Sequence, residues 1–245
     1  MAMGKFPEAV YDFTYAIKLQ ENETDNKKQL SEYHRYAGQS YFEMCQYQEA
    51  YDHFDFAVDN EPNAINYFNR GLARSKQGQY DIQKINAAIK DFGLAHKLLT
   101  ADKKDKSIEA YYCKYNLGIN YRRLNTPKDF EESINALRLA IDLFPEKSSC
   151  HNNLALSYFE KQDYESAVAY FSSAIKLEPQ SNYFNNRGLT HYYMANYQQA
   201  FLDFEEALAN NKTGDPTILF NRGNTYMSQR IFDLALKDYD AAFKR

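Results

Sequence analysis

Five asparagines share one local context that could bind another polypeptide. Each lies two residues before a glycine or an alanine, and they are Asn69, Asn116, Asn153, Asn186 and Asn221. A primary amide offers N–H donors and a carbonyl acceptor, so it can bind the main chain of an extended peptide without requiring particular side chains. Asparagine is a mediocre helix former, so its recurrence in this one context needs a reason beyond local structure.

Apolar side chains accompany these asparagines at fixed offsets. They are Phe68 and Tyr115, one residue before an asparagine, and Leu72, Ile119, Leu156 and Leu189, three residues after one. On helices, this spacing predicts a groove lined by amides and apolar groups, which would take an extended segment or an amphipathic helix. In the alternative interpretation, the amides only bridge neighbouring helices or face water.

A second recurring set predicts ion pairs. Arg70, Arg187 and Arg222 each precede a glycine, and Asp91, Asp203 and Asp238 each precede a bulky Phe or Tyr further along the chain. A guanidinium group meets a carboxylate through two parallel hydrogen bonds. We therefore predict the buried or half-buried pairs Arg70–Asp91, Arg187–Asp203 and Arg222–Asp238. The alternative is that these arginines bind an acidic ligand.

The elements that position these residues follow from an internal repeat. An aromatic residue, an alanine three positions later, a phenylalanine after four more and an alanine after three more recur along the chain, as in Tyr197, Ala200, Phe204 and Ala207. Twelve residues before the first alanine stands another small residue, here Gly188. Small side chains let two antiparallel helices approach closely, and such pairs bury their faces only by stacking on one another.

This pattern resembles the tetratricopeptide repeat, a helix-turn-helix unit of about 34 residues. The resemblance implies an all-α protein, a right-handed α-solenoid that forms one domain over residues 1–245. The predicted units are a half repeat at 1–22 and six repeats at 31–63, 64–101, 111–147, 148–180, 181–215 and 216–245. We expect Met1–Gly4 to be the tail of a missing first helix, and either the chain to be a segment of a longer protein or its ends to be covered by a partner.

The row of asparagines resembles the asparagine ladder in the repeat arm of nucleocytoplasmic O-linked N-acetylglucosamine transferase. The resemblance implies that Asn69, Asn116, Asn153, Asn186 and Asn221 bind a peptide backbone. It does not imply transferase activity, because no catalytic domain accompanies the repeats.

Composition excludes several other classes of protein. With 29 basic and 33 acidic side chains, the net charge is -4, which argues against nucleic acid as a partner. No stretch approaches the roughly 18 apolar residues of a membrane span. Cys45, Cys113 and Cys150 form no CxxC motif, and no Gly-rich nucleotide loop occurs, so we expect no metal and no cofactor.

The sequence therefore predicts a non-catalytic scaffold or adaptor that binds another protein in a concave groove, in a reducing compartment, most simply the cytoplasm. One alternative is a substrate-recruiting or regulatory arm of a larger enzyme. Another is a structural subunit of a large assembly, such as a ciliary or transport particle. Self-association through uncapped solenoid ends is also open.

Overall fold

The structure is a computed structural model that describes residues 6–20, 26–78, 80–211 and 215–244. These residues form thirteen α-helices and no strand. The predicted all-α solenoid class is confirmed. The expected tail of a missing helix at Met1–Gly4 lies outside the described residues.

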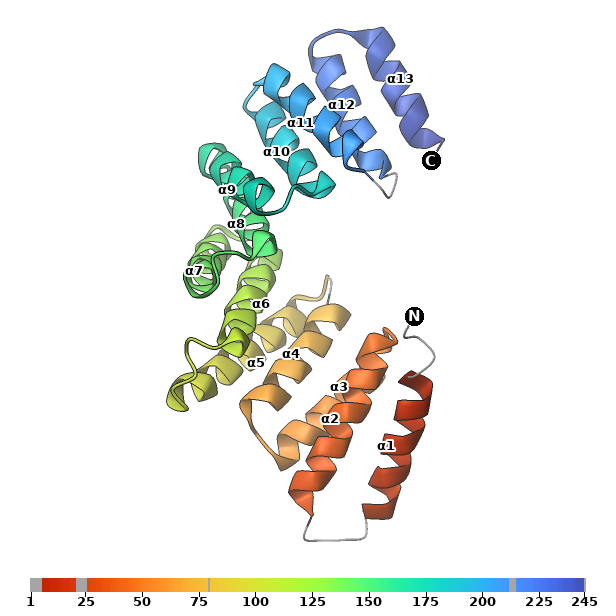
Figure 1. Cartoon of the computed structure of the whole chain (residues 1–245), viewed down its shortest axis with the longest axis vertical. Coiled ribbons are helices and arrows are strands. Elements are labelled where there is room, and N and C mark those ends of the chain that lie inside the picture. The colour runs from red at the N-terminus through yellow and green to blue at the C-terminus, as the bar shows by residue number, and fades with distance from the viewer. Residues whose placement is uncertain (1–5, 21–25, 79, 212–214, 245) are drawn as a thin grey trace. The chain divides into compact units, whose positions relative to one another are not determined.

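The chain divides between Leu124 and Asn125 into two compact units, a boundary that falls inside the predicted repeat at 111–147. In the first unit the helices are α1 Phe6–Gln20, α2 Lys27–Glu43, α3 Tyr47–Asn60, α4 Ala64–Gln77, α5 Ile82–Ala101 and α6 Ile108–Leu124. In the second they are α7 Pro127–Leu143, α8 Ser148–Glu160, α9 Tyr164–Leu177, α10 Ser181–Tyr193, α11 Tyr197–Ala209, α12 Pro216–Ser228 and α13 Phe232–Phe243. Within each unit, consecutive helices pack as hairpins (Figure 1).

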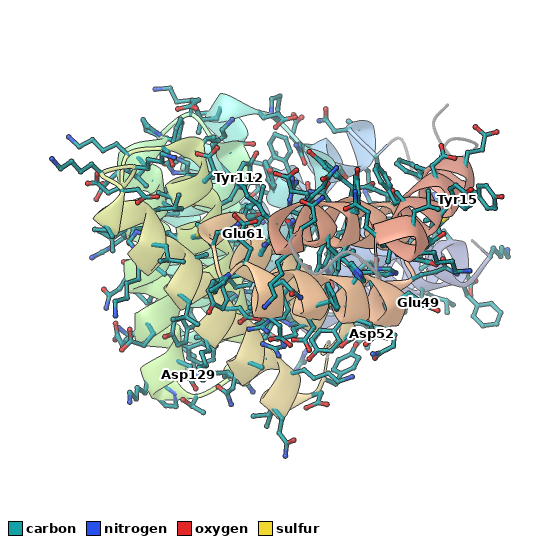
Figure 2. All side chains as sticks on the ribbon, turned by 90° about the horizontal axis from the view of Figure 1, so that it is seen from below. Tyr15, Glu49, Asp52, Glu61, Tyr112 and Asp129 are labelled. Atoms are coloured by element: carbon teal, nitrogen blue, oxygen red, sulfur yellow. The ribbon has the colours of Figure 1, made fainter. Side chains whose placement is uncertain are left out.

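We call α2, α4, α6, α8, α10 and α12 the first helices, because each opens a repeat, and the others the second helices. Helix α3 shows how a second helix divides its faces. Its alanines and Phe54 are buried against the neighbouring helices, whereas Glu49 and Asp52 are exposed on its outer side (Figure 2). This amphipathic pattern is what the repeat requires, because only one face of the helix meets another element.

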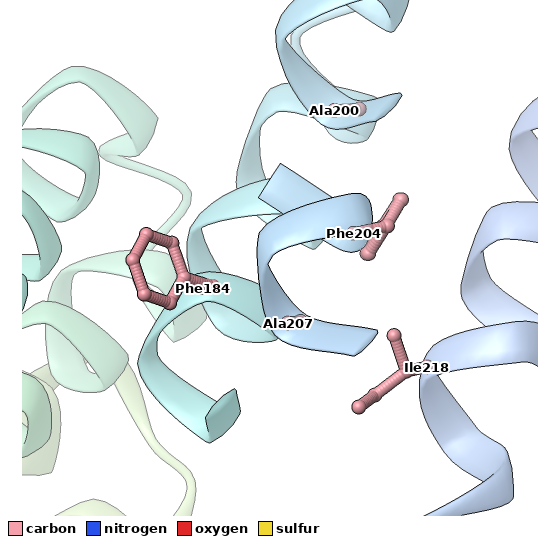
Figure 3. Packing of buried hydrophobic residues seen from close by; sticks show 5 residues of the cluster. All are labelled: Phe184, Ala200, Phe204, Ala207 and Ile218. Atoms are coloured by element: carbon pink, nitrogen blue, oxygen red, sulfur yellow. The ribbon is translucent and has the colours of Figure 1, made fainter. Parts of the chain in front are cut away.

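The small residue of a first helix makes room for the aromatic ring of the following helix. A Cβ atom added to Gly38 would lie 2.7 Å from Cε1 of Phe54, and one added to Gly188 would lie 2.9 Å from Cε1 of Phe204. Real Cβ atoms do not approach this closely, so a side chain at either position would force the ring to shift. The same packing continues into the next repeat, where Phe204 of α11 and Ile218 of α12 belong to one buried cluster (Figure 3).

The turns that join first to second helices share one backbone geometry. Cys45, Asn125, Gln162, Ala195 and Arg230 all have φ between 57° and 66°, although none of them is glycine. At Ala195, the N–H of the following Asn196 donates to the carbonyl of His191 at 2.9 Å, which is the long bond of a Schellman helix end. The same bond follows the left-handed residue at Cys45, Gln162 and Arg230, so in these four turns the next N–H satisfies one of the last carbonyls of the first helix.

Candidate functional site

The five row asparagines all lie on first helices, two in the first unit and three in the second. Their side-chain amides are not used alike. In the second unit, Nδ2 of Asn186 donates to Oδ1 of Asn152 at 3.1 Å, and Nδ2 of Asn221 donates to Oδ1 of Asn185 at 3.0 Å. These two amides therefore bridge one first helix to the preceding first helix.

Two other amides bond within their own helices. Nδ2 of Asn116 donates to the carbonyl oxygen of Tyr112 at 2.8 Å, and Nδ2 of Asn153 donates to that of Ser149 at 2.9 Å. Such back-bonding, four residues along a helix, competes with main-chain donors and explains why asparagine is tolerated there. The nitrogen of each of these amides thus has a partner in its own helix.

Asn69 differs from the other four. Its side chain is only 6% exposed, and its Nδ2 has no hydrogen-bond partner among the described residues. A buried amide nitrogen that lacks an acceptor lowers stability by about 1–3 kcal/mol. Asn69 is therefore the row member whose donor is buried and unsatisfied.

Asn69 lines a cavity of about 560 Å³ in the first unit. Phe13 of α1, Tyr36 of α2 and Leu72 of α4 give this cavity apolar walls, and the rings of Phe13 and Tyr36 stack at 5.4 Å between centroids. We call it the Asn69 cavity. The exposed carboxylate of Glu43 also lines it.

A second cavity, of about 500 Å³, is lined by other residues of α4. Ile65 and Phe68 of α4 and Tyr112 of α6 form its apolar walls, and Lys104 and Glu109 also line it. We call it the Phe68 cavity. Consecutive residues of α4, Phe68 and Asn69, thus line two separate cavities.

The other apolar residues predicted for the groove are all partly exposed. They are Phe68, Leu72, Tyr115, Ile119, Leu156 and Leu189. The two aromatic ones also pack inside the unit: the ring of Phe68 meets Phe92 edge-on at 5.6 Å between centroids, and Tyr115 stacks on Tyr111 at 5.8 Å. Both rings thus contribute to packing inside the unit and remain partly exposed.

The arginines and aspartates come together in every repeat that carries both. Nη2 of Arg187 lies 2.6 Å from Oδ1 of Asp203, with a second bond from Nε to Oδ2 at 2.9 Å. Arg222 makes the same two-bond contact with Asp238, at 2.7 and 2.8 Å. The aspartates are almost fully buried, so each guanidinium neutralises a carboxylate inside the seam between two helices.

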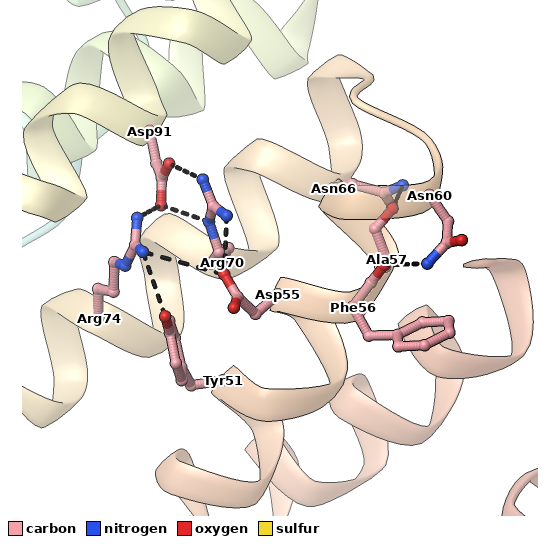
Figure 4. A network of polar contacts seen from close by, with 9 residues as sticks. All are labelled: Tyr51, Asp55, Phe56, Ala57, Asn60, Asn66, Arg70, Arg74 and Asp91. Carbon is pink, nitrogen blue, oxygen red and sulfur yellow. Dashed lines mark hydrogen bonds and ion pairs between the residues drawn. The ribbon is translucent and has the colours of Figure 1, made fainter.

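The first unit contains a larger network than the sequence analysis foresaw (Figure 4). Arg70 meets Asp91 through bonds of 2.7 and 3.1 Å and also binds Asp55 of the preceding helix at 2.8 Å. Arg74 binds Asp91 as well, at 2.6 Å, and donates to the hydroxyl of Tyr51 at 3.3 Å. Arg74 lies one helical turn after Arg70, a spacing that could have indicated the second cation.

These contacts also set the protonation of the groups involved. The hydrogen bond from Arg222 to Asp238 raises the pKa of Arg222, and burial opposes it. Burial acts to lower the pKa of Arg70, but Asp91 and Asp55 outweigh it and raise that pKa. The arginines are therefore charged at any physiological pH and already hold carboxylates of the same chain, which leaves little reason to assign them an acidic ligand.

The described residues show no other chemical constellation. No three His, Cys, Asp or Glu side chains among them come together as metal ligands. In the same residues, no helix has the length and apolar character needed to cross a membrane.

Stacked antiparallel hairpins, with a small residue beneath each buried aromatic ring, define an α-solenoid repeat protein. The family model of the tetratricopeptide repeat matches residues 148–181, and a second model of the same description matches residues 185–245. The chain belongs to the tetratricopeptide repeat family.

Relatives and solved structures agree with this assignment. Human tetratricopeptide repeat protein 6 is 27% identical over 200 residues, which cover 81% of this chain and 36% of that protein. A tetratricopeptide repeat protein from Parabacteroides merdae matches with a TM-score of 0.69 at 15% identity, over 99% of this chain and 92% of that one. YrrB, a TPR protein with an unusual peptide-binding site, matches with a TM-score of 0.59 at 17% identity, over 82% and 93%.

The chain spans 18% to 36% of the length of the curated relatives it matches. At these identities the solved structures establish the fold. Tetratricopeptide repeats are protein-interaction modules, so the chain is a protein-interaction scaffold.

Proposed function

We propose that this scaffold is non-catalytic and binds an extended segment of a partner protein on its first helices. The observation that carries the proposal is the pair of cavities on either side of α4, because each combines half-buried apolar walls with polar groups. Cavities of roughly 300–1,000 Å³ with few polar groups are typical of ligand sites. Each has room for one or two side chains of a peptide.

The asparagine row contributes to the same surface. A primary amide has two N–H donors and one acceptor, so the single bonds that Asn116, Asn186 and Asn221 make to the protein leave them able to bind a peptide as well. We propose that the row and its apolar neighbours hold the partner's main chain in each unit. YrrB, a solved structure of the same fold, has a peptide-binding site, which is in line with this proposal.

Site-specific photo-crosslinking tests which face binds. A photoreactive amino acid replaces an exposed residue of a first helix, Tyr112 of α6 or Tyr193 of α10, or as a matched control an exposed residue of a second helix, Leu139 of α7 or Leu202 of α11. In extract of the source cells, we expect the same partner protein to be joined to both first-helix positions and to neither control. Crosslinking only at the second helices would overturn the proposal.

A second candidate is an assembly role through α13. Its apolar side chains Phe232, Leu236 and Phe243 are 58%, 62% and 94% exposed. Large apolar groups at one face of a helix indicate that another element packs there. If copies of this chain associate through α13, light scattering of the wild type will give at least twice the monomer mass of 28.6 kDa, and Leu236→Glu will restore the monomer. A monomeric wild type would reject this candidate.

A further inference from the structure

The Asn69 cavity contains an amide that points to a particular kind of ligand atom. The Nδ2 of Asn69 lacks an acceptor among the described residues, and Asn69 lines the cavity. The nearby hydroxyl of Ser40 donates to the carbonyl of Tyr36 at 3.0 Å, and Nδ2 of Asn69 makes no hydrogen bond to it. The ligand must therefore bring an acceptor oxygen to a buried position.

The sequence explains why Asn69 lacks the bridge to the preceding first helix that Asn186 and Asn221 make. In the second unit, the acceptors for Asn186 and Asn221 are Asn152 and Asn185, which stand 34 and 36 residues earlier on the preceding first helix. Each acceptor directly precedes a row asparagine. The corresponding position before Asn69 is Arg35, whose side chain has no acceptor and lies over the ring of Tyr36.

The walls and the rim restrict the ligand further. Phe13, Tyr36 and Leu72 favour a large apolar side chain. Glu43 is exposed at the cavity and forms no ion pair with the described residues, so it favours a cation beside that side chain. An extended segment fits better than a helix, because the carbonyl groups of a helix are already bonded within it.

We propose that the Asn69 cavity anchors an extended peptide in which a large apolar residue is followed by lysine or arginine. The apolar side chain packs in the cavity against the stacked rings of Phe13 and Tyr36 and against Leu72, the neighbouring main-chain carbonyl accepts a hydrogen bond from Nδ2 of Asn69, and the cation pairs with Glu43. This inference rests on the proposed function, because it names the part of the partner that the scaffold holds.

Capped hexapeptides test the proposal on the whole chain. The probe is acetyl-Ser-Gly-Phe-Lys-Gly-Ser-amide, with control peptides in which serine replaces the phenylalanine or glutamate replaces the lysine. We expect the probe to shift the side-chain N–H signals of Asn69 in a 1H–15N spectrum, where they are assigned by their loss in Asn69→Leu. We expect the serine control to bind at least tenfold more weakly and the glutamate control a few-fold more weakly.

Variants of the chain separate binding at the Asn69 cavity from binding of the peptide elsewhere on the chain. Asn69→Leu should weaken the probe at least tenfold, whereas Asn60→Leu, the same change at the end of α3 and outside the cavity lining, should leave its affinity unchanged. Arg35→Asn keeps Asn69 but gives it an internal acceptor, so it should weaken the probe to a similar degree even if Asn69→Leu disturbs the fold. Glu43→Gln should weaken only peptides that carry the lysine.

Unchanged affinity in Asn69→Leu and Arg35→Asn, or equal binding of the serine control, would overturn the anchor. So would the absence of any binding by the probe. These outcomes are distinct from failure of the proposed function, because a partner crosslinked at Tyr112 and Tyr193 would show that the first helices still bind a protein elsewhere.

Discussion

The same residue type at the same repeat position serves different ends in the two units. In the second unit, Asn186 and Asn221 bond to amides of the preceding first helix and so help to hold the stack together. In the first unit, Asn69 is buried, but its donor has no partner among the described residues and its side chain lines a cavity. A recurring polar residue in a repeat protein therefore has no fixed role, because its bonds depend on the side chains and carbonyls that surround it.

The comparison also shows which features the two units share. Both place an arginine against a buried aspartate and a glycine beneath an aromatic ring, with nearly equal distances. The packing framework is thus common, and the difference lies in the polar residues laid over it. Variants at matched positions in the two units can test this division.

The largest effect is expected from removing the arginine of an ion pair. Arg187→Met leaves Asp203, which is 4% exposed, with only His191 at 3.9 Å, so we expect a loss of about 3–5 kcal/mol. Arg70→Met should have a smaller effect, about 1–2 kcal/mol, because Arg74 still binds Asp91. Urea unfolding, combined with hydrogen exchange to assign the loss to a unit, measures both. Equal losses would show that Arg74 does not compensate.

Removing a row amide should change the unfolding free energy with opposite sign in the two units. Asn221→Ala removes the hydrogen bond between the two helices and leaves Oδ1 of Asn185 without its donor. We therefore expect the second unit to lose about 1–2 kcal/mol of stability. Asn69→Leu removes an unsatisfied buried donor, so the first unit should keep or gain stability. The same unfolding experiment measures both variants. A clear loss in Asn69→Leu would mean that the Asn69 amide has a stabilising partner.

Much of this could be predicted from the sequence, because it depends on spacing. The repeat gave the helices and hairpins, and the paired positions of Arg and Asp indicated which side chains meet, since both lie in the seam that the repeat builds. The branched network at Asp91 was not foreseen, because Arg74 and Asp55 stand outside the three matched pairs.

The use of the amides was harder to read. Whether an asparagine bridges two first helices depends on the side chain that faces it from the preceding first helix, and the spacing of the five asparagines alone does not indicate that side chain. Asn152 and Asn185, each directly before a row asparagine, were the signal that was overlooked. The division into two units depends on the packing of many helices together, so no single sequence motif predicts it.

A histidine of the first unit should make that unit sensitive to acid. His34 stacks on Phe56 with 3.8 Å between ring centroids, and burial, with the charge of His53, lowers the pKa of His34 from 6.5 to about 4. Between pH 6.5 and about 4, His34 is therefore protonated in the unfolded chain and neutral in the folded chain. Stability is fully present above pH 6.5 and is lost as the pH falls toward 4.

One residue at the same repeat position in the second unit is Phe184, which has no charge to gain. His34→Phe copies it and should remove about 1 kcal/mol of this acid sensitivity, a value kept small because His34 is only half buried and water screens its charge. Unfolding free energies at pH 7 and pH 4.5, compared between wild type and variant, measure the difference. An identical pH dependence would show that His34 is protonated without penalty in the folded chain.

The smallest effect concerns the left-handed turns that both units share. Ala195 has φ of 57°, a conformation that strains a residue with a Cβ atom, so Ala195→Gly should stabilise the second unit by about 0.5–1 kcal/mol. Asn125, with φ of 59°, is the matched control, because asparagine tolerates this region and Asn125→Gly should change stability little. Cys45→Gly makes the test in the first unit and should behave like Ala195→Gly. Thermal unfolding resolves such differences as shifts of a few degrees, and a destabilising Ala195→Gly would show that the added freedom of the unfolded chain outweighs the relief of strain.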